Sequence, residues 1–217
     1  MNALLQLDLP SRERQPWGLH KVRAGRVLFA QGEPFHGLYA VRSGTLKSVF
    51  ALADGREQVC AFPMAGDVIG FDGVVDGVHG TTMTALEDTH VAPLAWRSCA
   101  QLAACDANPL QHLMELMARD IQRGHTFHAL LGRANAQERL AMFLLDQSRR
   151  WHAQGCSPCD FQLRMSRAEI GSFLCMSMET VSRTFSGMQR KGWLRVDNRR
   201  VILSDMVGFT RRFGALP

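Results

Sequence analysis

The chain has 217 residues, of which 46% are hydrophobic and 21% charged, a composition typical of one large or two small globular domains and not of a disordered chain. The net charge of +5 is uneven: residues 1–134 carry 12 basic and 13 acidic side chains, whereas residues 135–217 carry 13 and 7. The basic C-terminal part favours a polyanionic partner, with a merely solvated basic face as the alternative.

The sequence predicts a cytoplasmic protein with no membrane partner. It contains no apolar run long enough to cross a bilayer. The N-terminus, residues 1–5, is followed at once by Asp8 and Pro10 and lacks the basic start and long apolar core of a signal peptide.

Six cysteines should therefore be thiols, as is usual in a reducing cytosol. Cys156 and Cys159 form a single CxxC, with His152 as the one further ligand type close by. A structural zinc site usually needs two more ligands at suitable spacing. We interpret this pair as part of a loop, with metal or redox chemistry as the alternative.

From His20 to about Leu94, short apolar or alternating runs are separated by glycine turns. The runs at 27–30, 37–42, 45–50 and 58–62 are followed by turns such as Ser43-Gly44 and Asp54-Gly55. This spacing predicts an antiparallel β sandwich or barrel. An enzyme with a cupin-like barrel would need clustered histidines and glutamates, and the segment has no His-x-His pair.

The pattern becomes helical at Ser98, with a short helix expected at 98–104 and a long one at 108–134. Asn108 is the expected cap of the long helix, and Pro109 its first residue. Apolar or small residues recur along it at three- and four-residue steps: Leu113, Met117, Ile121, Gly124, Phe127 and Leu131. Such a narrow stripe predicts a dimerisation helix that pairs with a second copy; the alternative is that it packs on its own β domain.

Asn135 and Glu138 form a predicted capping box that begins a helix at 136–152. We place the boundary of the C-terminal domain here. The predicted organisation is a β domain at 1–107, a dimerisation helix at 108–134 and a third domain at 135–217.

A helix-turn-helix is predicted within this third domain. Ser166 and Glu169 form a capping box for a helix ending at Leu174, residues 175–177 form a turn, and a second helix spans 178–191 before Gly192. The angle between the two helices should be filled by Ile170, Leu174, Val181 and Phe185. Residues 193–196 and 200–203 then read as a hairpin wing. A helical hairpin inside an enzyme is the alternative, but the wing and the basic charge favour DNA binding.

The second helix suits the major groove, because Glu179, Ser182 and Arg183 lie on one face. Glutamate can accept a hydrogen bond from cytosine N4, and arginine can bind guanine through two hydrogen bonds. Ser177 and Thr180 belong to the same predicted interface. Outside the helix, Arg167 and Arg199 are expected to contact phosphate, or merely to add to the positive electrostatic field.

The whole chain resembles the Crp/Fnr family, and within it the Fnr branch. The motifs that carry the resemblance are at 28–33, 38–44, 65–72, 136–141 and 179–183. The resemblance implies an α+β fold: an N-terminal antiparallel β-roll of the cupin-like jelly-roll type, a long dimerisation helix and a C-terminal winged helix-turn-helix. It also implies an Fnr-type inverted repeat with TTGAT half-sites and RNA polymerase as a partner.

The effector groups of the family are missing. Cyclic-nucleotide-binding members hold the ribose with a glutamate and the phosphate with an arginine followed by serine or threonine; the aligned positions here are Phe71 and Gly80-Thr81. Fnr holds an iron–sulfur cluster on N-terminal cysteines and one in the β-roll. Residues 1–21 contain no cysteine, and the β-roll position aligns with Ala92. The sequence therefore predicts neither cyclic nucleotide nor iron–sulfur cluster.

A haem- or thiol-based sensor, whose DNA binding depends on the cofactor, is the alternative function. Its candidate haem ligands are His79, His90, His112, His125 and His128. Its candidate redox thiols are Cys60, Cys99, Cys105 and Cys175. Isolated histidines and buried cysteines are more often packing residues, so we identify no metal site, no cofactor and no catalytic residue.

Overall fold

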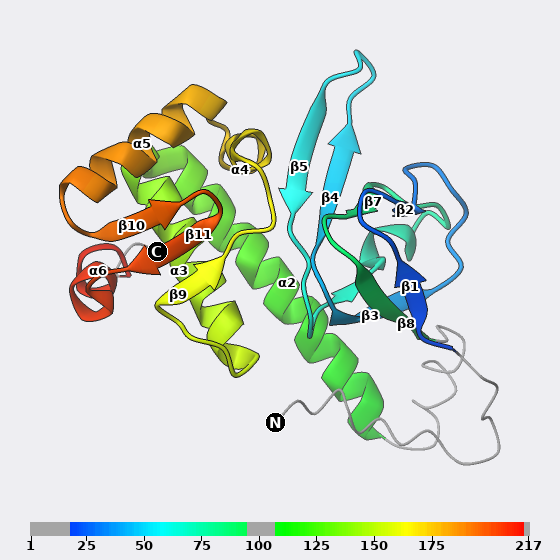
Figure 1. Ribbon diagram of the computed structural model, residues 1–217. Coiled ribbons are helices and arrows are strands. Elements are labelled where there is room, and N and C mark those ends of the chain that lie inside the picture. Colours follow the sequence, from blue (N-terminus) through cyan, green and yellow to red (C-terminus); the bar gives the residue numbers. More distant parts are fainter. Residues whose placement is uncertain (1–17, 95–106, 215–217) are drawn as a thin grey trace. The chain divides into compact units, whose positions relative to one another are not determined.

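The computed structural model describes residues 18–94 and 107–214. The chain divides into two compact units, Met1–Ile121 and Gln122–Pro217. The division falls inside the long helix α2 (Ala107–Arg133) (Figure 1). The predicted organisation instead kept this helix as a separate segment at 108–134, and the helix predicted at 98–104 lies outside the described residues.

The first unit contains two antiparallel sheets. In one, the order is β1 (His20–Val22), β8 (Thr89–Leu94), β3 (Leu38–Ser43) and β6 (Val68–Ile69). In the other, it is β2 (Val27–Phe29), β7 (Thr82–Ala85), β4 (Leu46–Ala51) and β5 (Glu57–Ala61). The prediction of an antiparallel β-roll is confirmed.

Both sheets contribute to one hydrophobic core, because alternate side chains of each strand point to the same side. Its buried members are Val22, Phe29, Val41, Leu46, Ile69, Met83, Ala85 and Val91. The predicted Ser-Gly turn joins β3 to β4 at Gly44, whose φ is +88°. A Cβ at Gly44 would approach the Cα of Thr89 to 2.8 Å, so this turn requires glycine on two grounds.

The second unit holds the C-terminal half of α2 and the predicted winged helix-turn-helix. Its elements are α3 (Ala136–Ala153), β9 (Asp160–Gln162), α4 (Arg167–Leu174), α5 (Met178–Arg190), β10 (Leu194–Asp197), β11 (Arg200–Leu203) and α6 (Met206–Phe213). The capping box of Asn135 and Glu138 at the start of α3 is present as predicted.

Three details differ from the sequence analysis. Helix α2 begins at Ala107, one residue before the expected cap at Asn108. Strand β9 adds a third strand to the wing, in the order β10-β11-β9, and α6 follows the wing. Strand β9 escaped the sequence analysis because three residues are too few to establish a period. Helix α6 lacks the capping box that marked the equally short α4. Among the described helices, none combines the length and apolarity that crossing a membrane requires.

Candidate nucleic-acid interface

The helix-turn-helix is set by side-chain caps at both of its helices. The Ser166 hydroxyl accepts from the Glu169 N–H at 3.2 Å, and the Glu169 carboxylate accepts from the Ser166 N–H at 2.7 Å. Ser177 caps α5 by accepting from the Thr180 N–H at 3.1 Å. Each cap satisfies backbone donors that a helix start leaves free, so the starts of both α4 and α5 are fixed.

The turn packs directly onto α4 at Gly171. The N–H of Met176 donates to the Gly171 carbonyl at 2.8 Å. A Cβ at Gly171 would lie only 2.6 Å from the Met176 carbonyl oxygen. A glycine in a short helix beside a turn was the available sequence signal, and the sequence analysis did not use it.

The angle between α4 and α5 is filled as predicted. Ile170, Leu174 and Val181 are fully buried, and Phe185 is nearly so. On each helix the two side chains lie four residues apart, on the inner face. Their burial determines which face of α5 remains outside.

The outward face of α5 carries the predicted reading residues. Glu179, Ser182 and Arg183 are all exposed. Arg183 Nη2 lies 3.4 Å from the Thr180 hydroxyl, which in turn lies 2.9 Å from the Ser177 hydroxyl. These contacts limit the conformations of the arginine without burying it. Within the described residues, the Glu179 carboxylate has no hydrogen-bond partner and is free to accept one from outside.

Met178 also belongs to this face, although the sequence analysis did not include it. It is the first residue of α5 and 55% exposed. Its carbonyl accepts from the Ser182 hydroxyl at 3.0 Å, so the two residues are neighbours on the helix. An exposed methionine beside polar reading residues offers an apolar contact that they cannot make. Its position directly before Glu179 was the sequence signal that could have identified it as part of this face.

Arg167, for which the sequence predicted a phosphate contact or only a contribution to the positive field, makes its described contacts within the protein. Its guanidinium carbon lies 3.6 Å from the centroid of the Phe185 ring, and its Nη2 donates to the Asn198 carbonyl at 3.3 Å. Burial lowers the pKa of the Arg167 guanidinium. Arg167 therefore joins α4, α5 and the wing turn, where Asn198 adopts a left-handed φ of +53°.

Arg199, at the tip of the wing, is exposed, and its Nη1 donates to the Arg164 carbonyl at 3.0 Å. The wing is further supported by Arg200, which binds both carboxylate oxygens of Asp160 on β9 at 2.9 and 2.6 Å. The hydrogen bonds from Arg200 lower the pKa of Asp160. Strand β9 thus anchors the side of the wing opposite β10.

Arg139 links the end of α2 to the helix-turn-helix. Its guanidinium donates to the carbonyls of Leu131 at 2.7 Å, Ala134 at 2.9 Å and Leu174 at 3.2 Å. The carbonyls at the end of a helix lack partners inside that helix, and one side chain here serves the ends of both α2 and α4. The sequence analysis did not predict these three contacts, because the carbonyls lie at very different distances from Arg139 along the chain.

The predicted dimer stripe on α2 divides into buried and exposed positions. Leu113 is buried, and Phe127 stacks on Phe173 with ring centroids 4.4 Å apart, within the second unit. Ile121 is 56% exposed, as is Met114 at 61%, one heptad before it. The remaining stripe positions Met117, Gly124 and Leu131 are partly exposed. The exposed apolar positions are thus Met114 and Ile121, and Phe127 already has a partner in its own chain.

In the segment aligned with the nucleotide site, the donors of Thr81 are engaged by the protein's own chain. Phe71 begins a short 3-10 helix, η2 (Phe71–Gly73), and Gly80 precedes β7. The Asp72 carboxylate accepts from both the N–H and the hydroxyl of Thr81 at 2.9 Å. A bound phosphate would need a cation or several free donors, and here a carboxylate occupies the donors.

The candidate haem and thiol residues are dispersed. His79 is buried against Phe29, with ring centroids 3.7 Å apart, and His90 and His128 bond to Ser43 and Gly124 within the chain. His125 is exposed. The described residues contain no group of three or more potential metal ligands. Free thiols are seen at Cys60, Cys156, Cys159 and Cys175, whereas Cys99, Cys105 and the His112 side chain lie outside the described residues.

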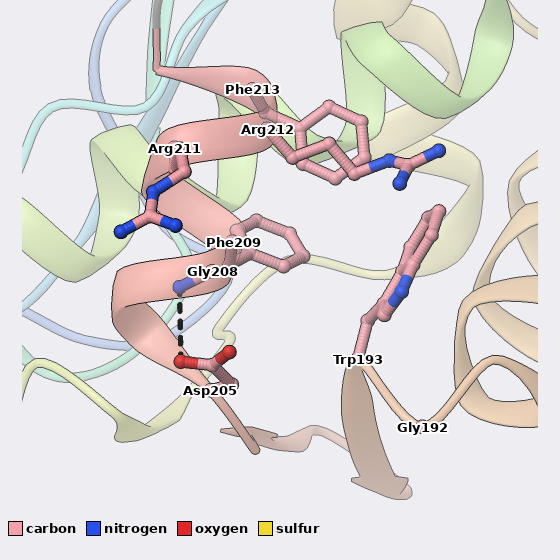
Figure 2. Close-up of a pocket in the computed structure, with 8 residues that line it drawn as sticks. All are labelled: Gly192, Trp193, Asp205, Gly208, Phe209, Arg211, Arg212 and Phe213. Carbon is pink, nitrogen blue, oxygen red and sulfur yellow. Dashed lines mark hydrogen bonds between the residues drawn. The ribbon is translucent and has the colours of Figure 1, made fainter.

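A pocket of about 460 Å³ lies beyond the C-terminal end of α5, between the turn at Gly192 and α6 (Figure 2). Trp193 forms one wall, with Lys191 Nζ and Arg212 Cζ each 4.6 Å from its ring centroid. Helix α5 has 13 residues, which places this pocket about 18 Å from Met178. It is therefore separate from the reading face.

Comparison with known proteins matches both units to described domain families. Residues 19–104 match the cyclic nucleotide-binding domain, and residues 138–212 match the Crp-like helix-turn-helix domain. The second match spans the caps, the turn and the wing described above.

Relatives match nearly the whole chain. It is 36% identical to the transcriptional regulatory protein btr of Bordetella pertussis, over 98% of this chain and 86% of that protein. It is 35% identical to the fumarate and nitrate reduction regulatory protein of Escherichia coli, over 97% and 84%. The solved structure of FixK2 from Bradyrhizobium japonicum superposes with a TM-score of 0.80 at 30% identity, covering 89% of this chain and 96% of that one. The chain belongs to the Crp/Fnr family of transcription regulators, whose members bind DNA through a helix-turn-helix and are not enzymes.

Proposed function

We propose that this regulator binds, as a homodimer, an inverted repeat of TTGAT-like half-sites, with α5 of each copy in the major groove. The observation that carries the proposal is the exposure of Glu179, Ser182 and Arg183 on one face of α5. The opposite face is buried against α4, so this is the face available to base edges.

Each reading residue has a chemical role. Arg183 binds O6 and N7 of a guanine, and Glu179 accepts from N4 of a cytosine on the other strand. A carboxylate close to phosphates is repelled unless a base donor pairs with it, so Glu179 favours sequence-specific binding. Ser182 contacts a neighbouring base or phosphate, and Met178 supplies apolar contact for a thymine methyl group.

The proposed dimer forms along α2, through the exposed Met114 and Ile121 and their neighbours on the stripe. A two-fold axis then presents two copies of α5 to successive major grooves, about 34 Å apart on one side of the duplex. Because its partner is DNA, we place the protein in the bacterial cytoplasm. RNA polymerase is the further partner that we propose for a transcription regulator.

The proposal includes no cyclic nucleotide and no iron–sulfur cluster. Phe71 and Gly80 replace the charged side chains that a cyclic nucleotide needs, and residues 1–21 provide no thiolates. An absorption spectrum of the purified protein tests the alternative cofactor-dependent sensor. A colourless protein that binds DNA supports the proposal, whereas a Soret band or broad visible absorption contradicts it.

The main test is a selection from random DNA with the wild type, Arg183→Ala and Arg195→Ala. Arg195 is an exposed cation on β10 and serves as the matched control. We expect Arg183→Ala to lose about 1–3 kcal/mol of specific binding per half-site and to lose preference at the guanine. Arg195→Ala should weaken all sequences alike and reduce the salt dependence. Recovery of the same half-site by Arg183→Ala, with undiminished preference, would show that Arg183 reads no base.

A further inference from the structure

A single carboxylate, that of Asp72, links the two ends of the segment between β6 and β7 by hydrogen bonds. Asp72 lies in η2 just after β6, and Thr81 lies just before β7. Asp72 Oδ2 accepts from both the N–H and the hydroxyl of Thr81, each at 2.9 Å. The Thr81 hydroxyl oxygen accepts from the Ser48 hydroxyl of β4, also at 2.9 Å. The donors thus run in one direction, from Ser48 through Thr81 to the carboxylate.

This carboxylate lies at the surface, beside a buried histidine. The Asp72 side chain is 27% exposed, and the His79 side chain, whose Nδ1 lies 3.5 Å from Asp72 Oδ1, is 2% exposed. His79 stacks on Phe29 and meets Phe35 edge-on. Hydrogen bonds to a charged group are stronger than those between neutral groups, and the donors of the half-buried Thr81 would lose them without the carboxylate.

The same segment is the one in which the glutamate and arginine of nucleotide-binding relatives are replaced by Phe71 and Gly80. We infer that Asp72 is a built-in anion: its carboxylate takes the Thr81 donors that an anionic effector would need, so the β-roll is closed by its own chain and not by a small molecule. This inference deepens the proposed function by explaining DNA binding without a ligand, and it rests on that function only where DNA affinity is measured.

An external anion would have to displace the carboxylate and would meet its negative charge. Wild-type protein should therefore bind DNA with the same affinity, and melt at the same temperature, with or without cyclic AMP or cyclic GMP. A clear rise in melting temperature at submillimolar nucleotide would overturn the inference.

The direct test is chemical rescue of Asp72→Ala in the full chain. Removing the carboxylate should lower the melting temperature by about 2–6 °C and weaken DNA binding, because the Thr81 donors lose their acceptor. Formate, acetate or inorganic phosphate at tens of millimolar should then restore at least half of the lost melting temperature. The melting measurement needs no DNA, so failure of the proposed function would not affect it.

Two controls distinguish a built-in anion from general salt effects. Asp72→Asn keeps the volume and one acceptor oxygen, so added carboxylates should find no space and give no rescue. Asp54→Ala removes a carboxylate on the exposed β4–β5 turn, which pairs with Arg56, and should respond to the added anions no more than wild type does.

A milder variant keeps the inference testable if Asp72→Ala does not fold. Thr81→Val removes the hydroxyl but keeps the backbone N–H, so it should melt below wild type. Asp72→Asn removes the charge of the acceptor, and Thr81→Val removes one of its donors. Added to Thr81→Val, Asp72→Asn should therefore cost less than it does in the wild type, because both changes weaken one shared interaction. The inference would be overturned if Asp72→Ala melted at the wild-type temperature, or if added anions raised the melting temperature of Asp54→Ala as much as that of Asp72→Ala. Additive effects of Thr81→Val and Asp72→Asn on the melting temperature would also overturn it.

Discussion

The two units use their polar side chains in opposite ways. In the β-roll, Ser48 hydrogen-bonds to Thr81 and Thr81 to Asp72, in the segment that aligns with the nucleotide site of cyclic-nucleotide-binding members of the family. In the winged helix-turn-helix, Glu179 and Arg183 point outward from a helix whose other face is fully buried. One unit satisfies its polar groups internally, and the other presents them to a partner.

This difference shows that function can be inferred from family membership more safely for the winged helix-turn-helix than for the β-roll. A helix-turn-helix reads DNA with a few exposed side chains on a packed scaffold, and both parts are present here. A nucleotide site needs charged groups from several elements to converge on one anion, and the aligned positions here are Phe71 and Gly80, with the Asp72 carboxylate bound to Thr81. The function of each unit follows from its own residues and not from the domain name it shares.

The largest effect is expected at the exposed part of α2, because the contrast between the two units assumes a DNA-binding dimer that forms there. Ile121→Glu should place two carboxylates at the two-fold axis, give monomers and lower DNA affinity at least about 100-fold, because each copy then binds one half-site alone. Sedimentation velocity and fluorescence anisotropy measure both effects. Gln122→Glu, a charge added next to the stripe, is the control. A stable Ile121→Glu dimer would exclude this helix face as the interface.

A second pair of variants tests the close packing at the turn of the helix-turn-helix. Gly171→Ala should destabilise the helix-turn-helix by about 1–3 kcal/mol, since the new methyl group meets the Met176 carbonyl. Gly187→Ala is a matched control on α5, where a Cβ has no neighbour within 4 Å. It should stabilise the unit by up to about 1 kcal/mol. Thermal unfolding measures both, and equal effects of the two variants would contradict the close packing at the turn.

The apolar part of the reading face can be tested on the DNA alone. Replacing each half-site thymine in turn by deoxyuridine removes one methyl group. At the base that Met178 contacts, this should cost wild type about 0.8 kcal/mol, or roughly fourfold in affinity. Met178→Ala should bind the two DNAs equally, while Ser182→Ala should keep the difference. The same loss in wild type and Met178→Ala at every thymine would remove Met178 from the reading face.

The smallest effect is expected at the turn itself. Cys175 has a left-handed φ of +53° at the end of α4, a conformation that a side chain makes unfavourable. Cys175→Gly should raise stability by roughly 0.5–1 kcal/mol and leave DNA affinity unchanged. Cys175→Ala keeps the Cβ and should give no gain. Calorimetry measures the difference, and lower stability of Cys175→Gly would mean that the thiol contributes more than the strain costs.

Local sequence signals determined the helix-turn-helix almost to the residue. The capping boxes at Asn135 and Ser166 act between residues three apart, and Gly192 ends the second helix with a φ of +71°. Because one face of α5 must be apolar to pack, its polar positions were also readable from the sequence. For the β-roll, turn residues and alternation predicted the sheet class, but not which strands pair.

Tertiary structure alone decided the contacts between residues far apart in the chain. Arg139 joins the ends of α2 and α4, Arg167 joins Phe185 to the wing, and Asp72 closes onto Thr81. It also gave Phe127 a partner in its own unit while leaving Ile121 exposed. The sequence alone does not show whether an arginine or aspartate binds DNA, a ligand or another group of its own chain. Its partner is set by which surfaces the packed core brings within hydrogen-bonding distance.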